Sequence, residues 1–360
     1  MILGQSQDAP NRHRKSERRR LWLCPAILAA CLISISLRAG RTADRADEVV
    51  VYTALDQFYS EPLLKQFEEK TGIRVRSRYD TEATKTTGLF NRMVAERRRP
   101  RCDVFWNNEV LRTVALKRLG LLQPYKSPSA ADIPDDFKDP EGYWTGFAAR
   151  ARVIVYNTTL LTSRTAPQSV AELAEPKWRK RTAIAYPLFG TTATHGAALF
   201  ALLGDAKARA YFEALKQNDI QVLDGNAQVA KTVARGELAA GLTDTDDVHA
   251  LRLDGKPVDF ILPDQGPDGL GAVLIPNTLA LLRDCPHPEA GKKLIDFLLD
   301  PSVENALARG RSAQIPVRPT GVRSACGLDP ASIRLMPFDY EKADAKMEPS
   351  ARFLRELFAR

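Results

Sequence analysis

Residues 241–247, GLTDTDD, place Asp244, Asp246 and Asp247 at the end of a short apolar run. Such a run, stopped by small and acidic residues, is typical of a buried parallel strand that delivers side chains to a crevice at its carboxyl end. Three carboxylates so close together repel one another, so they need a cation, an ammonium group or hydrogen-bond donors beside them. A solvent-exposed loop is the alternative interpretation. The segment is the strongest candidate for a binding site in this chain.

Other polar side chains follow further apolar runs. Each lies where a strand is expected to end, and each could instead cap the helix that follows. They are Asp56 after residues 49–55, Thr84 in the hydroxyl-rich loop 79–87, and Asn108 and Glu109 after residues 103–106. Because the carboxyl ends of parallel strands open on one crevice, these side chains are predicted to face a common ligand.

Arginine and threonine side chains at other positions could bind an anionic group of the ligand. Arg150 and Arg152 alternate in an expected strand, which directs both side chains to one face, where a guanidinium can bind a carboxylate or a phosphate. Thr191 and Thr192 lie in GTTATH, residues 190–195, at the start of a helix whose free N–H groups favour an anion. Ordinary helix capping, and pairing of the arginines with structural acids, are the alternatives left open.

The sequence contains no recognisable catalytic arrangement. After the N-terminal region the histidines are His195, His249 and His287, and none lies in an H-E-x-x-H or H-x-H pattern. The chain also has no G-x-S-x-G nucleophile motif and no phosphate-binding loop. An enzyme is therefore not expected.

The N-terminal region has the pattern of an export signal. Basic residues precede the apolar stretch 21–37 and small residues follow it, so we expect a signal peptide over residues 1–46, with a retained membrane anchor as the alternative. The sequence LAAC, residues 28–31, also has the form of a lipoprotein cleavage site, which would place a lipid on Cys31. The mature protein is expected in the periplasm.

The formal charge of +8 belongs mostly to this signal. Residues 1–46 contribute +6, so residues 47–360 carry only +2 and give no electrostatic reason to expect nucleic acid.

The cysteines after residue 46 lack the C-x-x-C spacing of a zinc or redox motif. Cys102 is expected to be a buried thiol, whereas Cys285 and Cys326 could form a disulfide in an oxidising compartment.

Strands and helices are expected to alternate along the chain. The expected strands cover residues 49–52, 73–75, 103–106, 152–156, 182–185, 239–242, 258–262, 272–275 and 278–282. The expected helices cover residues 60–72, 88–98, 110–119, 195–203, 207–218, 227–235, 288–299, 303–308 and 350–358. Asn226 is expected to cap the helix 227–235, which Gly236 ends. The alternation favours an α/β fold with parallel, doubly wound sheets.

The length of the chain favours two lobes. About 314 residues follow position 46, which is too many for one compact core. The chain is expected to cross between the lobes near residues 147–153 and to return near residues 269–275. Residues 47–150 together with 271–360 would then form lobe 1, and residues 151–270 would form lobe 2, with a ligand cleft between them.

Several segments are shared with a known family. They are VYTA at 51–54, FEEKTGIRV at 67–75, DVFW at 103–106, ARARVIVYNT at 149–158, PKW at 176–178 and PNT at 276–278. Over about residues 49–317 the chain resembles the periplasmic substrate-binding proteins of bacterial ABC importers, in the ferric-iron-binding branch of the type 2 fold. The resemblance implies a two-lobed protein that closes on a ligand and delivers it to a membrane permease.

The resemblance also implies an iron site, built in that family from adjacent tyrosines with a His and a Glu. At the matching positions this chain has Asp246 and Asp247 in place of the tyrosines and Asp56 in place of the histidine. Asn108, with Glu109 beside it, stands in place of the acid. Iron binding by the family's usual tyrosine pair is therefore not expected here.

Two ligand hypotheses follow. In the first, Fe(III) or another metal binds as the transported ligand, not as a cofactor, in an all-oxygen site. That site would contain Asp56, Glu109, Asp246 and Asp247. In the second, a zwitterionic or anionic organic solute, such as an aminophosphonate, places its amine on the aspartates. Its carboxylate or phosphonate then faces Arg150, which matches the family's anion-binding arginine, and the helix start at residues 190–194.

The expected partners are the permease and ATPase subunits of an ABC importer, and the protein is expected to be a monomer. An extracytoplasmic sensor partner, which binds a solute and then docks on a receptor, is the alternative. In either case Asp56, Thr84 and Asn108 are expected to reach the ligand from one lobe. Arg150, Thr191, Asp246 and Asp247 would reach it from the other lobe.

Overall fold

The computed structural model describes residues 48–80, 87–319 and 321–359. The strands are β1 (Glu48–Thr53), β2 (Arg74–Tyr79), β3 (Val104–Asn107), β4 (Leu122–Gln123), β5 (Thr145–Asn157), β6 (Thr182–Ala185), β7 (Gln221–Leu223), β8 (Ala240–Asp244), β9 (Val258–Ile261) and β10 (Leu274–Leu282). The α-helices are α2 (Gln57–Thr71), α3 (Thr87–Ala95), α4 (Leu111–Arg118), α5 (Gly190–Leu203), α6 (Asp205–Gln217), α7 (Asn226–Ala234), α8 (Thr245–Leu253), α9 (Pro288–Leu298), α10 (Pro301–Arg309) and α11 (Tyr340–Leu357). Strands and helices alternate as predicted.

Some of the sequence predictions concern residues outside this description. The expected export signal over residues 1–46, with Cys31, and the candidate ligand residue Thr84 lie outside the described residues. Within the part of the chain that the structure describes, no helix is both long enough and apolar enough to cross a membrane.

The strands pair in the order β2-β1-β3-β10-β5-β8-β6-β7, with β4 on β10 and β9 on β5. Parallel pairs lie at the two ends of this order, where β1 pairs with β2 and β3, and β6 pairs with β7 and β8. Antiparallel pairs lie in the middle, where β5 pairs with β10, β8 and β9. The long strand β5 therefore belongs to both halves of the sheet.

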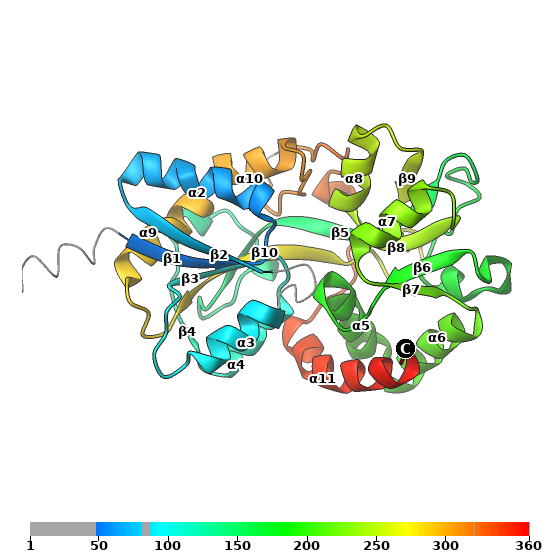
Figure 1. The fold of residues 1–360 in the computed structure, drawn as a ribbon, viewed down its shortest axis with the longest axis horizontal. Coiled ribbons are helices and arrows are strands. Elements are labelled where there is room, and N and C mark those ends of the chain that lie inside the picture. The colour runs from blue at the N-terminus through cyan, green and yellow to red at the C-terminus, as the bar shows by residue number, and fades with distance from the viewer. Residues whose placement is uncertain (1–47, 81–86, 320, 360) are drawn as a thin grey trace, which may run out of the picture. The chain divides into compact units, whose positions relative to one another are not determined.

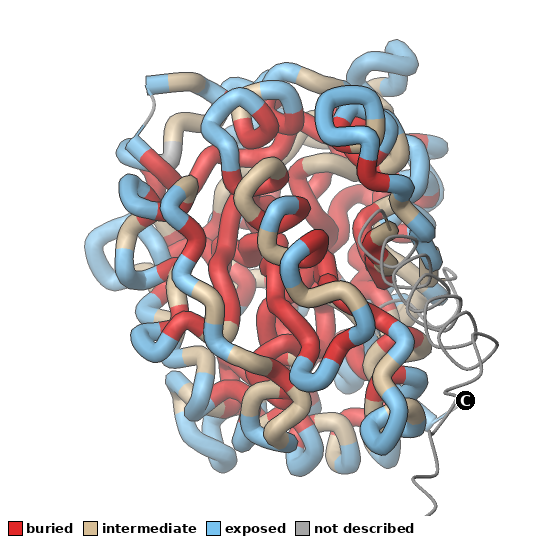
Figure 2. Tube along the Cα trace, turned by 90° about the vertical axis from the view of Figure 1, so that its left-hand side faces the viewer, coloured by how far each residue is buried: buried red, intermediate tan, exposed pale blue. Residues whose placement is uncertain are grey.

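Helices cover both faces of the strands. In Figure 1, α2 and α10 lie on one side of the half that contains β1 and β3, and α3 and α4 lie on the other side. The C-terminal helix α11 runs along α5 and also contacts α4. Strands β3, β5, β6, β8 and β10 are buried along their whole length, as expected for strands covered on both faces. Figure 2 shows these buried segments inside a shell of exposed residues.

The pairing of β5 with β10 in the middle of the sheet is irregular near Ala148, and a buried carboxylate stabilises the backbone there. Ala148 in β5 has a left-handed backbone, with φ of 43°. Its N–H donates to Glu304 Oε1 over 2.7 Å, and the side chain of Asn277 donates to its carbonyl oxygen. The β5–β10 register shifts beside it, between Pro276 and Asn277. A buried carboxylate from α10 thus stabilises the backbone where β5 passes between the two halves.

Several element boundaries differ from the sequence prediction. Helix α2 begins at Gln57 instead of residue 60, because Tyr59 and Ser60 already donate backbone hydrogen bonds to the carbonyl of Asp56. Pro62 lies inside this helix and does not open it. Residues 272–282, predicted as two strands, contain the single strand β10.

Two other helices are longer than predicted or begin earlier. Helix α5 starts at Gly190, five residues before the predicted start, and α11 covers Tyr340–Leu357 with Pro349 inside it. Helix α7 starts at Asn226, with Gly225 in the capping position. The prediction that the Asn226 side chain caps this helix was wrong, because that side chain bonds to groups of the candidate site described below.

The cysteines Cys102, Cys285 and Cys326 are all buried and free. The prediction of a buried thiol at Cys102 is confirmed. The disulfide considered for Cys285 and Cys326 does not form, because each thiol has a different neighbour. Cys285 Sγ accepts from the Gln123 amide, and Cys326 lies 3.1 Å from the Ser324 hydroxyl.

Substitution of Glu304 by Ala is expected to destabilise the fold by about 3–5 kcal/mol, because it removes a negative charge that balances the buried guanidinium of Arg318. Glu304 Oε2 lies 3.1 Å from Arg318 Nε, and both side chains are almost fully buried. Urea unfolding monitored by circular dichroism would measure the change. The control is Glu61→Ala, which removes a solvent-exposed pair with Lys65 and should leave the midpoint almost unchanged. Equal midpoints for wild type and Glu304→Ala would contradict this role.

Candidate functional site

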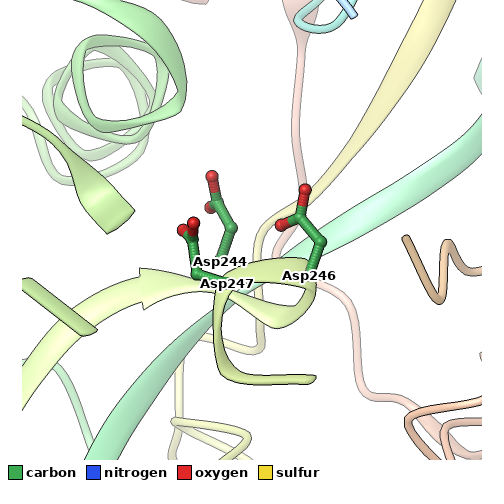
Figure 3. A group of neighbouring side chains, drawn as sticks. All are labelled: Asp244, Asp246 and Asp247. Carbon is green, nitrogen blue, oxygen red and sulfur yellow. The ribbon is translucent and has the colours of Figure 1, made fainter. Parts of the chain in front are cut away.

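The acidic segment predicted from the sequence lies where strand β8 passes directly into helix α8. Asp244 is the last residue of β8, and Asp246 and Asp247 lie in the first turn of α8. One oxygen from each carboxylate lies within 4.8 Å of the others, and Figure 3 shows the side chains pointing to the same side of the ribbon. We call these residues the aspartate cluster. A helix start favours negative charge, which helps the cluster to exist.

Asp244 is bound on both of its oxygens by the protein itself. Arg152 Nη1 donates to Oδ1 over 2.6 Å, and the Thr191 hydroxyl donates to Oδ2 over 2.6 Å. The amide of Asn226 also donates to Oδ2 over 3.0 Å. Because Arg152 lies opposite Asp244 in the β5–β8 register, strand pairing itself sets this contact.

The predicted anion-binding helix start belongs to the same network. Arg152 also donates to the hydroxyls of Thr191 and Thr192, over 3.1 and 3.2 Å. The Thr192 hydroxyl donates to Asn226 Oδ1 over 3.0 Å. The hydroxyls predicted to bind a ligand anion therefore contact an arginine, an amide and an aspartate of the chain. Among the two candidate arginines, it is Arg152, not Arg150, that contacts the start of α5.

Arg150 has a different environment. Its Nη1 lies 3.6 Å from Asp246 Oδ2, and the side chain is almost fully buried. Its Nε and Nη2 atoms are buried and have no hydrogen-bond partner within the described residues. This guanidinium therefore has hydrogen-bonding capacity directed at the side of the cluster that holds Asp246.

A tyrosine that the sequence prediction did not include lies beside the cluster. Burial raises the pKa of Tyr59 above its ordinary value, and the neighbouring carboxylates of Asp246 and Asp56 raise it further. Tyr59 lies one helical turn after Asp56, which occupies the capping position of α2. The i, i+3 spacing of these two residues at the start of a helix is the signal that could have identified Tyr59.

The remaining aspartate is fixed by its own strand. The Thr243 hydroxyl donates to Asp247 Oδ2 over 2.8 Å, and it also donates to the backbone carbonyl of Asn226. The cluster thus contains one carboxylate, Asp244, that is bound on both oxygens, and two further carboxylates on α8. Carboxylate and phenol oxygens are the ligands preferred by hard cations.

Glu109, a candidate metal ligand, has a structural role. Its carboxylate accepts from the backbone N–H groups of Leu111 and Arg112, over 2.8 and 2.9 Å, and so caps α4. It also accepts from the Thr194 hydroxyl of α5 over 2.9 Å. None of these bonds reaches the aspartate cluster. Its neighbour Asn108 is buried, and Asn108 Oδ1 has no hydrogen-bond partner within the described residues.

The histidines are separate from one another. His195 is buried in α5, and burial, together with the charge of Arg152, lowers its pKa to about 3. Burial also lowers the pKa of His249. His287 Nδ1 lies 2.8 Å from Asp103 Oδ2, where it joins the start of α9 to β3. In the described residues these histidines form no common site.

The chain matches a protein-family model described as bacterial extracellular solute-binding protein over residues 111–336, which is more than half of its length. It is similar to the major ferric iron-binding protein of Neisseria meningitidis, with 25% identity over 342 residues, 92% of this chain and 97% of that protein.

Solved structures are similar in fold. Iron-bound HitA from Pseudomonas aeruginosa superposes with a TM-score of 0.76 at 22% identity, over 86% of this chain and 99% of that chain. AfuA from Actinobacillus pleuropneumoniae, with fructose-6-phosphate bound, superposes with a TM-score of 0.73 at 24% identity, over 86% and 97%. These similarities confirm the predicted α/β architecture of two lobes with a ligand cleft between them. From its fold and from the match over residues 111–336, the chain belongs to the family of bacterial extracellular solute-binding proteins.

Proposed function

We propose that this protein is the periplasmic ferric-iron-binding component of an ABC importer. The observation that carries the proposal is the aspartate cluster, which gathers three carboxylates within 4.8 Å at the end of β8. The similarity to ferric iron-binding proteins of other bacteria supports the choice of metal. Fe(III) is the transported ligand, and its delivery to a permease and an ATPase completes the function.

The chemistry of the site supports a hard cation. Asp246 and Asp247 offer carboxylate oxygens from α8, and Asp56 with Tyr59 offers a carboxylate and a phenol from the start of α2. These oxygen donors suit Fe(III) better than a soft metal, which prefers thiolates. The positive charge of the buried Arg152 balances the negative charge of Asp244, whose Oδ1 lies 2.6 Å from Arg152 Nη1.

Ligand binding would couple the two halves of the sheet. Helix α2 follows β1, and helix α8 follows β8, so the proposed metal ligands come from different halves. A ligand that contacts both halves stabilises the closed arrangement, because those contacts are lost when the halves separate. In this proposal residues 47–150 and 271–360 form one lobe and residues 151–270 the other. The protein acts as a monomer without catalytic activity.

One observation favours a second candidate, a zwitterionic or anionic organic solute. Arg150 buries Nε and Nη2 without a hydrogen-bond partner in the described residues, and a carboxylate or phosphonate would satisfy them. The amine of the same solute would face Asp246 and Asp247. The structure of AfuA with fructose-6-phosphate bound is an example of an organic phosphate in a protein of similar fold.

Substitution of both Asp246 and Asp247 by Asn is expected to weaken ferric binding by about 100-fold or more, because it removes two anionic ligands. Competition with citrate, followed by absorbance, would measure the dissociation constant. Asp259→Asn is the matched control and should bind iron like wild type. Asp259 lies on β9 and forms a partly exposed ion pair with Arg252 of α8. Unchanged affinity in the double variant would show that the cluster is not the metal site.

Tyr59→Phe is expected to remove the visible absorption of the iron-loaded protein, because a phenolate-to-Fe(III) charge-transfer band requires the phenolate. The affinity should fall by about 10-fold, the lower end for losing a supporting group of a metal site. Tyr186→Phe is the control, since Tyr186 follows β6 instead of lying in α2. If the colour survives in Tyr59→Phe and is lost in Tyr186→Phe, the assignment of the phenol is wrong.

A thermal-shift panel on residues 47–360 separates the two ligand classes. A ligand at 100 times its dissociation constant should stabilise the protein by about 2.7 kcal/mol. We expect a raised melting temperature with Fe(III)-citrate and no rise with citrate alone, aminophosphonates or amino acids. A rise with an organic solute in the absence of metal would overturn the ferric proposal and support the second candidate.

A further inference from the structure

The start of helix α5 has the features of an oxyanion site, and a carboxylate of the protein contacts one of its hydroxyls. The helix is 14 residues long, and its first turn presents the hydroxyls of Thr191 and Thr192. Free N–H groups and hydroxyls at such a start stabilise negative charge. The group that lies there is the carboxylate of Asp244, 2.6 Å from the Thr191 hydroxyl.

A buried guanidinium makes this negative charge necessary. Arg152 is completely buried, so water cannot compensate its charge. Its Nη1 donates to Asp244 Oδ1 over 2.6 Å, while Nε has no hydrogen-bond partner within the described residues. The pair is therefore a fixed internal ion pair.

The position of Asp244 follows from the strands. Arg152 of β5 and Asp244 of β8 are directly opposite in the antiparallel register, and the Ala151 N–H donates to the Thr245 hydroxyl next to them. The Asn226 amide donates to Asp244 Oδ2 over 3.0 Å from a third element, α7. Backbone pairing and three side chains thus hold the carboxylate at the helix start.

We infer that Asp244 is a built-in anion that closes this site to phosphate, carbonate and small carboxylates from solution. Arg152 is then a positioning residue, which holds Asp244 next to Asp246 and Asp247. Under the proposed function, on which this second part rests, Fe(III) is bound without an accompanying anion at the start of α5. Asp244 thus takes the place that an anion from solution would otherwise occupy beside the metal.

The test removes the built-in anion and supplies one from solution, without iron. Asp244→Ala leaves Arg152, Thr191, Thr192 and Asn226 around an empty place of carboxylate size. We expect its melting temperature to fall below that of wild type and to rise again with millimolar acetate or phosphate. Chloride at the same ionic strength should not restore it, and wild type should not respond to acetate or phosphate.

A second variant keeps the test decisive if Asp244→Ala does not fold. Asp244→Ser keeps a small polar side chain but removes the carboxylate and its charge, so phosphate should still stabilise it more than it stabilises wild type. Asp259→Asn, which affects an ion pair at the surface of β9, is the control and should show no response to phosphate. The inference is overturned if neither Asp244 variant responds to an oxyanion, or if wild type responds as strongly as they do.

An iron measurement then connects the inference to the proposed function. The ferric affinity of wild type should be the same with and without phosphate, whereas Asp244→Ser should bind iron at least 10-fold more tightly with phosphate than without it. Anion rescue without any iron binding would contradict the proposed function alone. Iron binding by wild type that requires phosphate would contradict the built-in anion alone, so the two failures are distinguishable.

Discussion

The antiparallel pairing of β5 is the constraint on which the rest of the structure depends. This strand of 13 residues is buried along its length, pairs with β10 in one half of the sheet, and pairs with β8 and β9 in the other. A buried strand must satisfy every backbone donor and acceptor, so its register is strongly specified. That register places Arg152 opposite Asp244 and thereby fixes the geometry of the aspartate cluster.

The site combines two electrostatic environments that are close together. On one side Arg152, Thr191 and Asn226 bind Asp244 in a buried network. On the other side Asp246 lies near Arg150, whose guanidinium is not fully hydrogen-bonded within the described residues.

Much of the fold could be predicted from periodicity and end signals. Gly72 and Gly236 end helices α2 and α7 with positive φ, as glycine at a helix end indicates. The α/β alternation and the family resemblance were confirmed by the fold. The start of α2 was misplaced, because a proline near a helix start is an ambiguous signal and Pro62 lies inside the helix.

The site was harder to predict than the fold, because it depends on which side chains meet in three dimensions. The sequence indicated the acids at 244–247, and the structure places them together. It could not indicate that Arg152 binds the α5 start in place of Arg150, since that choice depends on the β5–β8 register. The sequence around Asn226 is typical of a helix cap, and its contact with Asp244 becomes visible only in the folded structure. Tyr59 was missed because no strand ends at it.

The hydrogen bond between Thr194 and Glu109 has a consequence for the speed of ligand uptake. It joins α5, in one half of the sheet, to the carboxylate that caps α4 in the other half. A hydrogen bond to a charged group contributes about 1.5–3 kcal/mol, so this bond favours arrangements in which the two halves are in contact. Association that requires prior opening is slower than simple docking. The same bond slows escape once the ligand is inside, which suits a protein that carries its cargo from one site to another.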